Sequence, residues 1–173
     1  MIVLIFGLPG SGKTTLAKEI AEYLRCPLVC TEEVRSYLYE EYDVPDDKDF
    51  TKEELVISYN TVQLLTKYIV ENNMSIVIEG VFRTRNQRKK ILDLANDKNE
   101  MVYSFYINCD KNVILERLVK RKKDRTISPC GPLTVNEIER SFEMPNKNEC
   151  IFIKNNSSIE ETKNFMIESI LRQ

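Results

Sequence analysis

An octet near the N-terminus has the spacing of a phosphate-binding loop, G-x-x-x-x-G-K-[ST]. Glycines at these positions let successive backbone N–H groups curl around a phosphate, while Lys13 can reach the β- and γ-phosphate oxygens and Thr14 can hold Mg²⁺. The octet therefore predicts a site for nucleotide phosphates, and the residues assigned to it are Gly7, Pro9, Gly10, Ser11, Gly12, Lys13, Thr14 and the adjoining Thr15.

The sequence on either side of the octet argues against a chance match in a glycine-rich turn. Residues 2–6 form the continuous apolar run that a buried parallel strand needs, and residues 14–25 carry apolar side chains at helical spacing. The octet then lies between a strand and the N-terminus of a helix, where the helix dipole favours an anion.

A carboxylate and an arginine follow the second expected strand, residues 27–30. Glu32 comes almost directly after this strand, and Arg35 lies one helical turn further along on the same face. Such a pair could take a proton from an attacking hydroxyl and hold an anionic acceptor. A solvated capping carboxylate beside a surface arginine is the alternative, and the spacing leaves both interpretations open.

Glu79 ends the third expected strand and precedes Gly80. A carboxylate at this place can hold a water on Mg²⁺ or orient a nucleophile, and a structural role at the strand end is the alternative. Three arginines follow within the next eight residues. We expect one of them to touch a ligand and the others to lie on a solvated face.

Arg117 and Arg121 are spaced i, i+4 on the helix expected after the fourth strand. A basic segment and a proline- and glycine-containing loop follow, which suits a lid that closes over phosphates and stabilises charge during transfer. A basic amphipathic helix that faces water is the alternative.

The composition excludes several other kinds of site. The 173 residues include no histidine and five cysteines without C-x-x-C spacing, so zinc sites and disulfide frameworks are disfavoured. Without histidine, proton transfer must rest on a carboxylate, a lysine or a tyrosine. The net charge of −2 does not favour a nucleic acid partner, although residues 83–90 and 117–125 are basic enough to guide one.

No apolar run approaches the roughly 20 residues of a membrane span, and the first apolar run leads straight into the octet. We therefore expect no membrane association and a cytoplasmic protein. Strand patterns at residues 2–6, 27–30, 75–79, 103–108 and 150–153 alternate with helical patterns. This alternation predicts one α/β domain over residues 1–173, with a parallel sheet, helices on both faces, and a ligand beyond the carboxyl ends of the strands.

Several of these segments together resemble the small P-loop kinases, and in particular the polynucleotide-kinase-like and adenylylsulfate-kinase-like phosphotransferases. The segments that carry the resemblance are residues 7–17, 31–35, 76–79 with Arg88, 116–118 with Arg121, and 142–145. The resemblance implies the three-layer P-loop nucleoside triphosphate hydrolase fold, with five strands and a lid after the fourth, at about residues 121–135. It also implies ATP with Mg²⁺ as the phosphoryl donor.

The same resemblance implies roles for individual residues. Lys13 and Thr14 match the phosphate and metal ligands, Glu32 stands at the position of the catalytic aspartate, and Arg35 matches the acceptor-binding arginine. Arg88 matches an arginine after the third strand, and Arg117 and Arg121 match the lid arginines. Glu32 and Glu79 stand where many relatives carry aspartate. The additional methylene group of glutamate moves each carboxylate outward.

The sequence thus predicts an ATP-dependent kinase acting on a hydroxyl of a small metabolite, a nucleotide or a polynucleotide 5′-end. Lys13, Glu32, Arg117 and Arg121 are the expected catalytic residues, and Arg117 is also expected to bind the nucleotide. Glu32, Arg35, Glu79 and Arg88 are the expected acceptor site. Thr14 and, through water, Glu79 are the expected metal ligands. A nucleoside monophosphate kinase is one alternative, and an ATP-binding module or slow ATPase without an acceptor is another. The identity of the acceptor and the oligomeric state stay open.

Overall fold

Five parallel strands form one sheet in the order β2-β3-β1-β4-β5. The computed structural model describes residues 1–39, 50–123, 132–155 and 158–172, and only the backbone of residues 121–123 and 132–134. The strands are β1 (Ile2–Phe6), β2 (Leu28–Cys30), β3 (Ile76–Gly80), β4 (Val102–Asn108) and β5 (Ile151–Lys154). All five expected strands are confirmed, each within a residue or so of its predicted bounds.

Seven helices lie in the described part of the chain, and most of them connect successive strands, as parallel pairing requires. They are α1 (Lys13–Leu24), α2 (Thr31–Tyr39), α3 (Lys52–Glu71), α4 (Arg85–Asp97), α5 (Lys111–Lys123), α6 (Pro132–Arg140) and α7 (Ile159–Leu171). Helices α3 and α4 each start with a capping box, in which the side chains of Thr51 and Thr84 accept the N–H three residues on. Helix α6 starts at Pro132, since proline suits the first turn of a helix.

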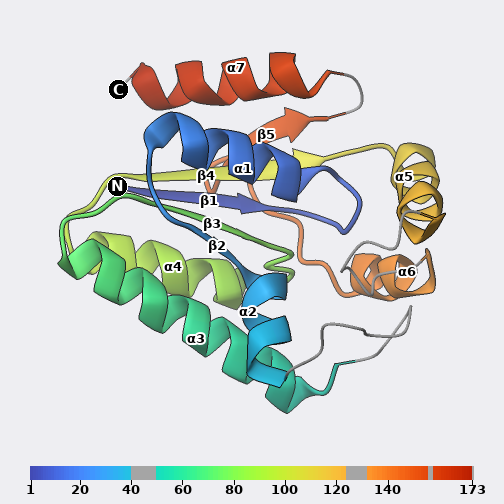
Figure 1. Cartoon of the computed structure of the whole chain (residues 1–173), viewed down its shortest axis with the longest axis horizontal. Helices are drawn as coiled ribbons and strands as arrows, with labels where there is room; N and C mark the ends of the chain where they lie inside the picture. Colours follow the sequence, from blue (N-terminus) through green and yellow to red (C-terminus); the bar gives the residue numbers. More distant parts are fainter. Residues whose placement is uncertain (40–49, 124–131, 156–157, 173) are drawn as a thin grey trace.

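The sheet lies between two layers of helices, with α1 and α7 on one face and α3 and α4 on the other (Figure 1). Successive side chains of a strand point to opposite faces. In β1, Val3 and Ile5 pack with the α1 and α7 core, whereas Ile2, Leu4 and Phe6 pack with the α3 and α4 core. This double burial explains why β1 is apolar at every position and is fully buried.

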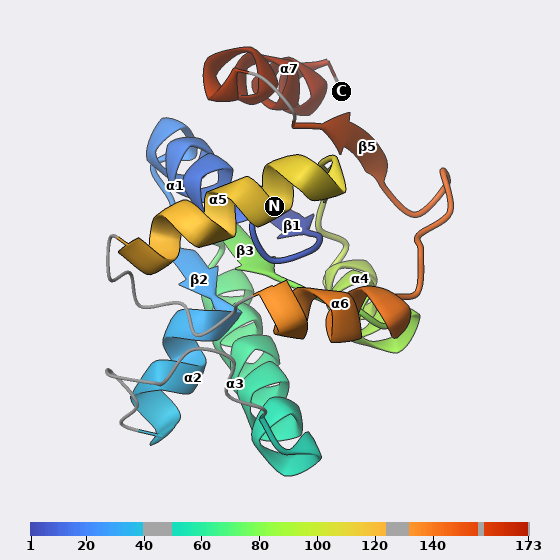
Figure 2. The ribbon, with the colours of Figure 1, turned by 90° about the vertical axis from the view of Figure 1, so that its right-hand side faces the viewer.

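The carboxyl ends of the central strands lie at a common edge of the sheet. Phe6 at the end of β1 pairs in register with Gly80 of β3 and with Tyr106 of β4, and Cys30 of β2 pairs with Glu79. The segments that follow β1, β2 and β3 therefore leave the sheet at one place. Figure 2 looks onto this end of the molecule, where α5 and α6 lie across the ends of the strands.

None of the helices in the described ranges combines the length and the apolar composition that a membrane span requires.

Candidate active site

The phosphate-loop octet forms a tight turn between β1 and α1. Its three glycines have positive φ angles of 147°, 79° and 93° at Gly7, Gly10 and Gly12. Gly7 also lies directly on the backbone of Ile107 in β4, so a Cβ at this position would overlap the carbonyl oxygen of Ile107. Side chains are excluded at these places by space and by backbone conformation, which leaves main-chain N–H groups to line the turn.

Lys13 and Glu79 lie together beneath this loop. Lys13 Nζ donates to the carbonyl of Leu8 at 2.9 Å and lies 3.8 Å from Glu79 Oε1. Both side chains are buried, and the side chains of Thr14 and Cys30 hydrogen-bond to the Glu79 carboxylate. The structure therefore brings together Lys13, Thr14 and Glu79, which the sequence assigned to phosphate and metal binding.

The electrostatics of this cluster follow from its burial. Burial raises the pKa of Glu79, and the positive charge of Lys13 offsets only part of that rise. The Glu32 carboxylate raises the pKa of Glu79 further, which shows that the two carboxylates are close enough to interact. Burial also raises the pKa of the Cys30 thiol, so the thiol stays protonated and can donate to Glu79.

Glu32 and Arg35 lie on the first turns of α2, which starts directly after β2. Arg35 Nη2 is 3.9 Å from Glu32 Oε1, and the Arg35 guanidinium lies over the ring of Phe50 at 3.8 Å from its centroid. Glu32 Oε1 is buried and has no hydrogen-bond partner among the described residues. The two residues therefore lie together as expected, with one carboxylate oxygen able to accept a further hydrogen bond.

Tyr59 of α3 is not a competing base. Its hydroxyl accepts the N–H of Phe82 at 3.2 Å, and the two rings pack edge to face with centroids 5.1 Å apart. Burial raises the pKa of Tyr59 to about 12, so the phenol keeps its proton near neutral pH. In a chain without histidine, the carboxylates of Glu32 and Glu79 are then the acidic groups of this site that can accept a proton.

Arg117 of α5 contacts the phosphate loop at Ser11. Its Nη1 donates to the carbonyl of Ser11 at 3.3 Å and to Cys109 Sγ at 3.6 Å, and its Nη2 donates to the carbonyl of Asn155 at 3.3 Å. Arg121 lies one turn further along α5, where only the backbone is described. The expected lid at about residues 121–135 falls mainly on residues 124–131, outside the described ranges.

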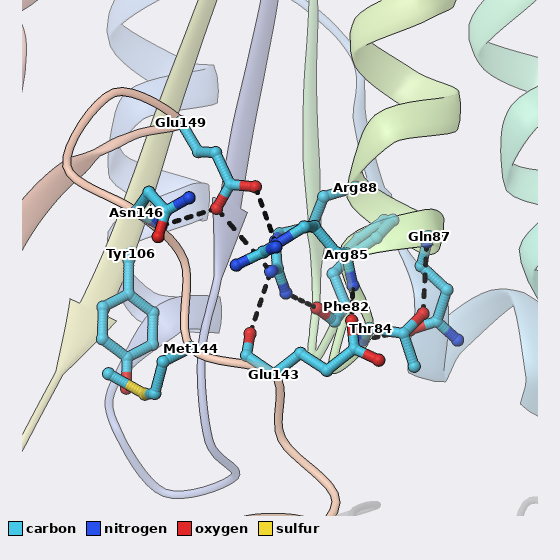
Figure 3. A network of polar contacts seen from close by, with 10 residues as sticks. All are labelled: Phe82, Thr84, Arg85, Gln87, Arg88, Tyr106, Glu143, Met144, Asn146 and Glu149. Atoms are coloured by element: carbon cyan, nitrogen blue, oxygen red, sulfur yellow. Dashed lines mark hydrogen bonds and ion pairs between the residues drawn. The ribbon is translucent and has the colours of Figure 1, made fainter.

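Arg88 lies in a different environment from the other expected site residues (Figure 3). Its side chain is buried, with Nη1 and Nη2 donating to the carbonyls of Phe82 and Glu143 at 2.9 Å each. The guanidinium also lies over the ring of Phe6 and 4.0 Å from Glu149. These contacts join the start of α4 to the segment before β5, and the structure does not group Arg88 with Lys13, Glu32 or Arg35.

Two residues near the loop were missed by the sequence analysis, namely Asn155 and Cys30. Asn155 follows β5 directly, is fully buried, and donates from Nδ2 to the Ser11 carbonyl at 2.8 Å. Cys30 is the last residue of β2 and pairs in register with Glu79. The rule that selected Glu32 and Glu79, a polar residue at the end of a strand, would have found both residues if it had been applied to every strand.

The chain belongs to a family of AAA domains, AAA_33, whose model matches residues 2–145. The five-stranded parallel sheet, the phosphate loop and this match together identify a P-loop kinase-like domain, as the sequence resemblance predicted.

Two relatives show the range of similar sequences. An adenylate kinase from Azobacteroides pseudotrichonymphae is 30% identical over 125 residues, covering 69% of this chain and 65% of its own length. An uncharacterised protein from Mycobacterium tuberculosis is 25% identical over 126 residues, which is 69% of this chain but only 25% of that protein. The chain thus spans less than two thirds of the length of either relative.

Solved structures share the fold at low sequence identity. A gluconokinase from Sinorhizobium meliloti superposes with a TM-score of 0.73 at 15% identity, over 98% of this chain and 91% of that one. An APS kinase from Mycobacterium tuberculosis, in complex with AMPPNP and APS, superposes with a TM-score of 0.72 at 14% identity, over 98% and 96%. The predicted P-loop kinase fold is thereby confirmed.

Proposed function

We propose that the protein is an ATP-dependent kinase that transfers the γ-phosphoryl group to a hydroxyl acceptor. The observation that carries the acceptor chemistry is the buried Glu32 Oε1, which has no hydrogen-bond partner among the described residues. A buried oxygen without a donor is costly, and an acceptor hydroxyl would supply that donor. The neighbouring Arg35 would hold the acceptor in place.

The donor site is assigned to the loop and to the side chains around it. The N–H groups of the octet and Lys13 would bind the phosphates, with Lys13 exchanging the carbonyl of Leu8 for phosphate oxygen. The buried carboxylate of Glu79 beside Thr14 suits a cation, because burial without one disfavours the charge of Glu79. We therefore assign Mg²⁺ to Thr14 and, through water, to Glu79; when bound, it neutralises charge on the phosphates.

The transfer itself requires little covalent chemistry from the protein. Glu32 accepts the proton of the acceptor hydroxyl as its oxygen forms a bond to the γ-phosphorus, and the bond from that phosphorus to the β-phosphate bridging oxygen breaks, releasing ADP. Arg117 would turn from the Ser11 carbonyl towards the transferring phosphoryl group, and a second lid role for Arg121 stays a prediction. Positioning and charge neutralisation supply most of the rate.

A nucleoside monophosphate kinase is the second candidate, because adenylate kinases are among the similar sequences. A phosphate acceptor is already ionised and needs no strong base. The proximity of Glu32 to Glu79 favours the hydroxyl kinase, since two carboxylates in one site repel a second phosphate dianion. A binding module or slow ATPase, as the candidate from another class, would show hydrolysis or binding that no acceptor accelerates.

The test is phosphoryl transfer from labelled ATP to AMP, nucleosides, sugars and 5′-hydroxyl oligonucleotides. Once an acceptor is found, Glu32→Gln should lower kcat by about 10²- to 10⁴-fold while the Kd for ATP changes less than about twofold. Glu33→Gln is the matched control, because Glu33 is the exposed neighbour on the same helical turn. Transfer to AMP that is unchanged in Glu32→Gln would establish the monophosphate kinase instead.

A further inference from the structure

Asn155, directly after β5, is hydrogen-bonded to the phosphate loop. It is fully buried, its Nδ2 donates to the carbonyl of Ser11 at 2.8 Å, and its backbone N–H donates to Asn108 at 2.8 Å. Its Oδ1 lies 3.4 Å from the Thr162 hydroxyl of α7. The side-chain amide is thus held on a strand end and a helix, and its donor is directed at one peptide unit of the loop.

The bond at Ser11 fixes the direction of the next N–H group. In a planar trans peptide the C=O and the following N–H point to opposite sides, so fixing the Ser11 carbonyl also fixes the N–H of Gly12. The carbonyl points towards Asn155, and the Gly12 N–H therefore points away from it. Gly12 begins α1 in a left-handed conformation, and a Cβ there would overlap Asn155 Nδ2, which shows how closely the amide packs on this turn.

Asn155 makes the shorter of the two hydrogen bonds to the Ser11 carbonyl. Arg117 Nη1 reaches the Ser11 carbonyl at 3.3 Å, compared with 2.8 Å for Asn155. If Arg117 turns towards a phosphate as proposed, Asn155 is the donor that stays. The loop then keeps its conformation at the step in which the arginine leaves.

We infer that Asn155 is a positioning residue for phosphate binding, which acts through the Ser11 carbonyl to aim the Gly12 N–H at the bound anion. This inference rests on the proposed nucleotide site but not on the identity of the acceptor. It predicts that losing the amide weakens binding of any ligand that places phosphates on the loop, whether or not the ligand carries an adenine.

The test compares Asn155→Ala and Asn155→Leu with the wild type in direct binding of ATP and of tripolyphosphate. Leu has nearly the size and branching of Asn, with neither the N–H donor nor a charge that would itself repel phosphate, so it separates the hydrogen bond from packing and decides the result where the alanine variant does not fold. Both ligands should bind about tenfold more weakly, the effect of one buried hydrogen bond. With the acceptor assay in hand, KM for ATP should rise by a similar factor and kcat should fall less.

Ile170→Ala is the control for a general loss of stability, because Ile170 lies in α7 and packs in the core on the same face of the sheet as α1. This variant should lose stability without weakening either ligand. The role of Asn155 would be overturned if both Asn155 variants bound ATP as tightly as the wild type. It would also be overturned if Ile170→Ala weakened binding of the two ligands as much as the Asn155 variants do. A wild type that binds neither ligand would overturn the proposed function instead.

Discussion

Replacing Arg88 should destabilise the protein without impairing its site. The Arg88 guanidinium donates to two backbone carbonyls, those of Phe82 and Glu143, at 2.9 Å each, and it lies 5.1 Å from the centroid of the Phe6 ring. A buried carbonyl left without a donor costs about 1–3 kcal/mol, and a desolvated cation–π contact contributes about 1–2 kcal/mol. Because water partly replaces the lost donors, we expect Arg88→Ala to lower the free energy of unfolding by about 3 kcal/mol.

One further variant separates the two hydrogen bonds of Arg88 from its charge, and a second serves as a control. Arg88→Lys keeps the charge but its single ammonium does not span both carbonyls, so a loss of about 1–2 kcal/mol is expected. Arg85→Ala is the matched control, since the Arg85 side chain is 55% exposed and its ion pair with Glu149, at 3.2 Å, lies at the surface. That pair is worth under about 1 kcal/mol.

Urea unfolding followed by circular dichroism gives these free energies, and the m-value shows whether each variant still unfolds in one step. Under native conditions the Kd for ATP and the KM for the acceptor should equal those of the wild type. A cost below about 1 kcal/mol in Arg88→Ala, together with a weaker acceptor KM, would refute the structural role and restore Arg88 to the acceptor site.

Four other experiments have outcomes that follow from the geometry. Gly12→Ala should abolish ATP binding and cost about 1–2 kcal/mol, because φ is 93° and a Cβ would overlap the Asn155 amide; calorimetric titration and urea unfolding measure the two effects. Without Mg²⁺, Glu79 has a higher pKa in the folded state than in the unfolded state, so protonation of Glu79 stabilises the fold. This stabilisation is complete below about pH 4.5 and is lost as pH rises through the folded pKa. The free energy of unfolding should therefore decline over this range in the wild type and not in Glu79→Gln. The raised pKa of Cys30 should make its alkylation by iodoacetamide at pH 8 much slower in the folded protein than in urea, and mass spectrometry that finds equal rates would contradict the buried thiol. Lys13→Ala should leave the fold intact and abolish phosphoryl transfer in the labelled-ATP assay, and a residual kcat near that of the wild type would contradict its role.

Much of the fold could be predicted because its signals are local. The apolar runs of β1 and β3, the capping boxes at Thr51 and Thr84, and the glycine spacing of the octet each depend on a few neighbouring residues. The rule that ligands lie beyond the carboxyl ends of parallel strands then placed Glu32 and Glu79 near the octet, and the structure has Glu79 3.8 Å from Lys13.

The same rule was less informative for the arginines, because it selects a position but not the direction of a long side chain. Arg88 and Arg117 both follow a strand and both match arginines of the kinases that the sequence resembles. Arg117 reaches the loop at Ser11, whereas Arg88 is buried between α4 and the segment before β5. Which carbonyls a guanidinium meets depends on segments far apart in the chain, and Arg88 and Glu143 are separated by 55 residues.

The sequence by itself determined the alternation of strands and helices, the phosphate loop and the two carboxylates at the sheet edge, because each follows from residue spacing and backbone preference. Only the tertiary structure decided that Cys30 donates to Glu79, that Asn155 and Arg117 share the carbonyl of Ser11, and that Arg88 joins two segments of the core. The physical reason is that such contacts arise from strand order and register. Asn155 and Ser11, 144 residues apart in the chain, meet only once five strands have paired into one sheet.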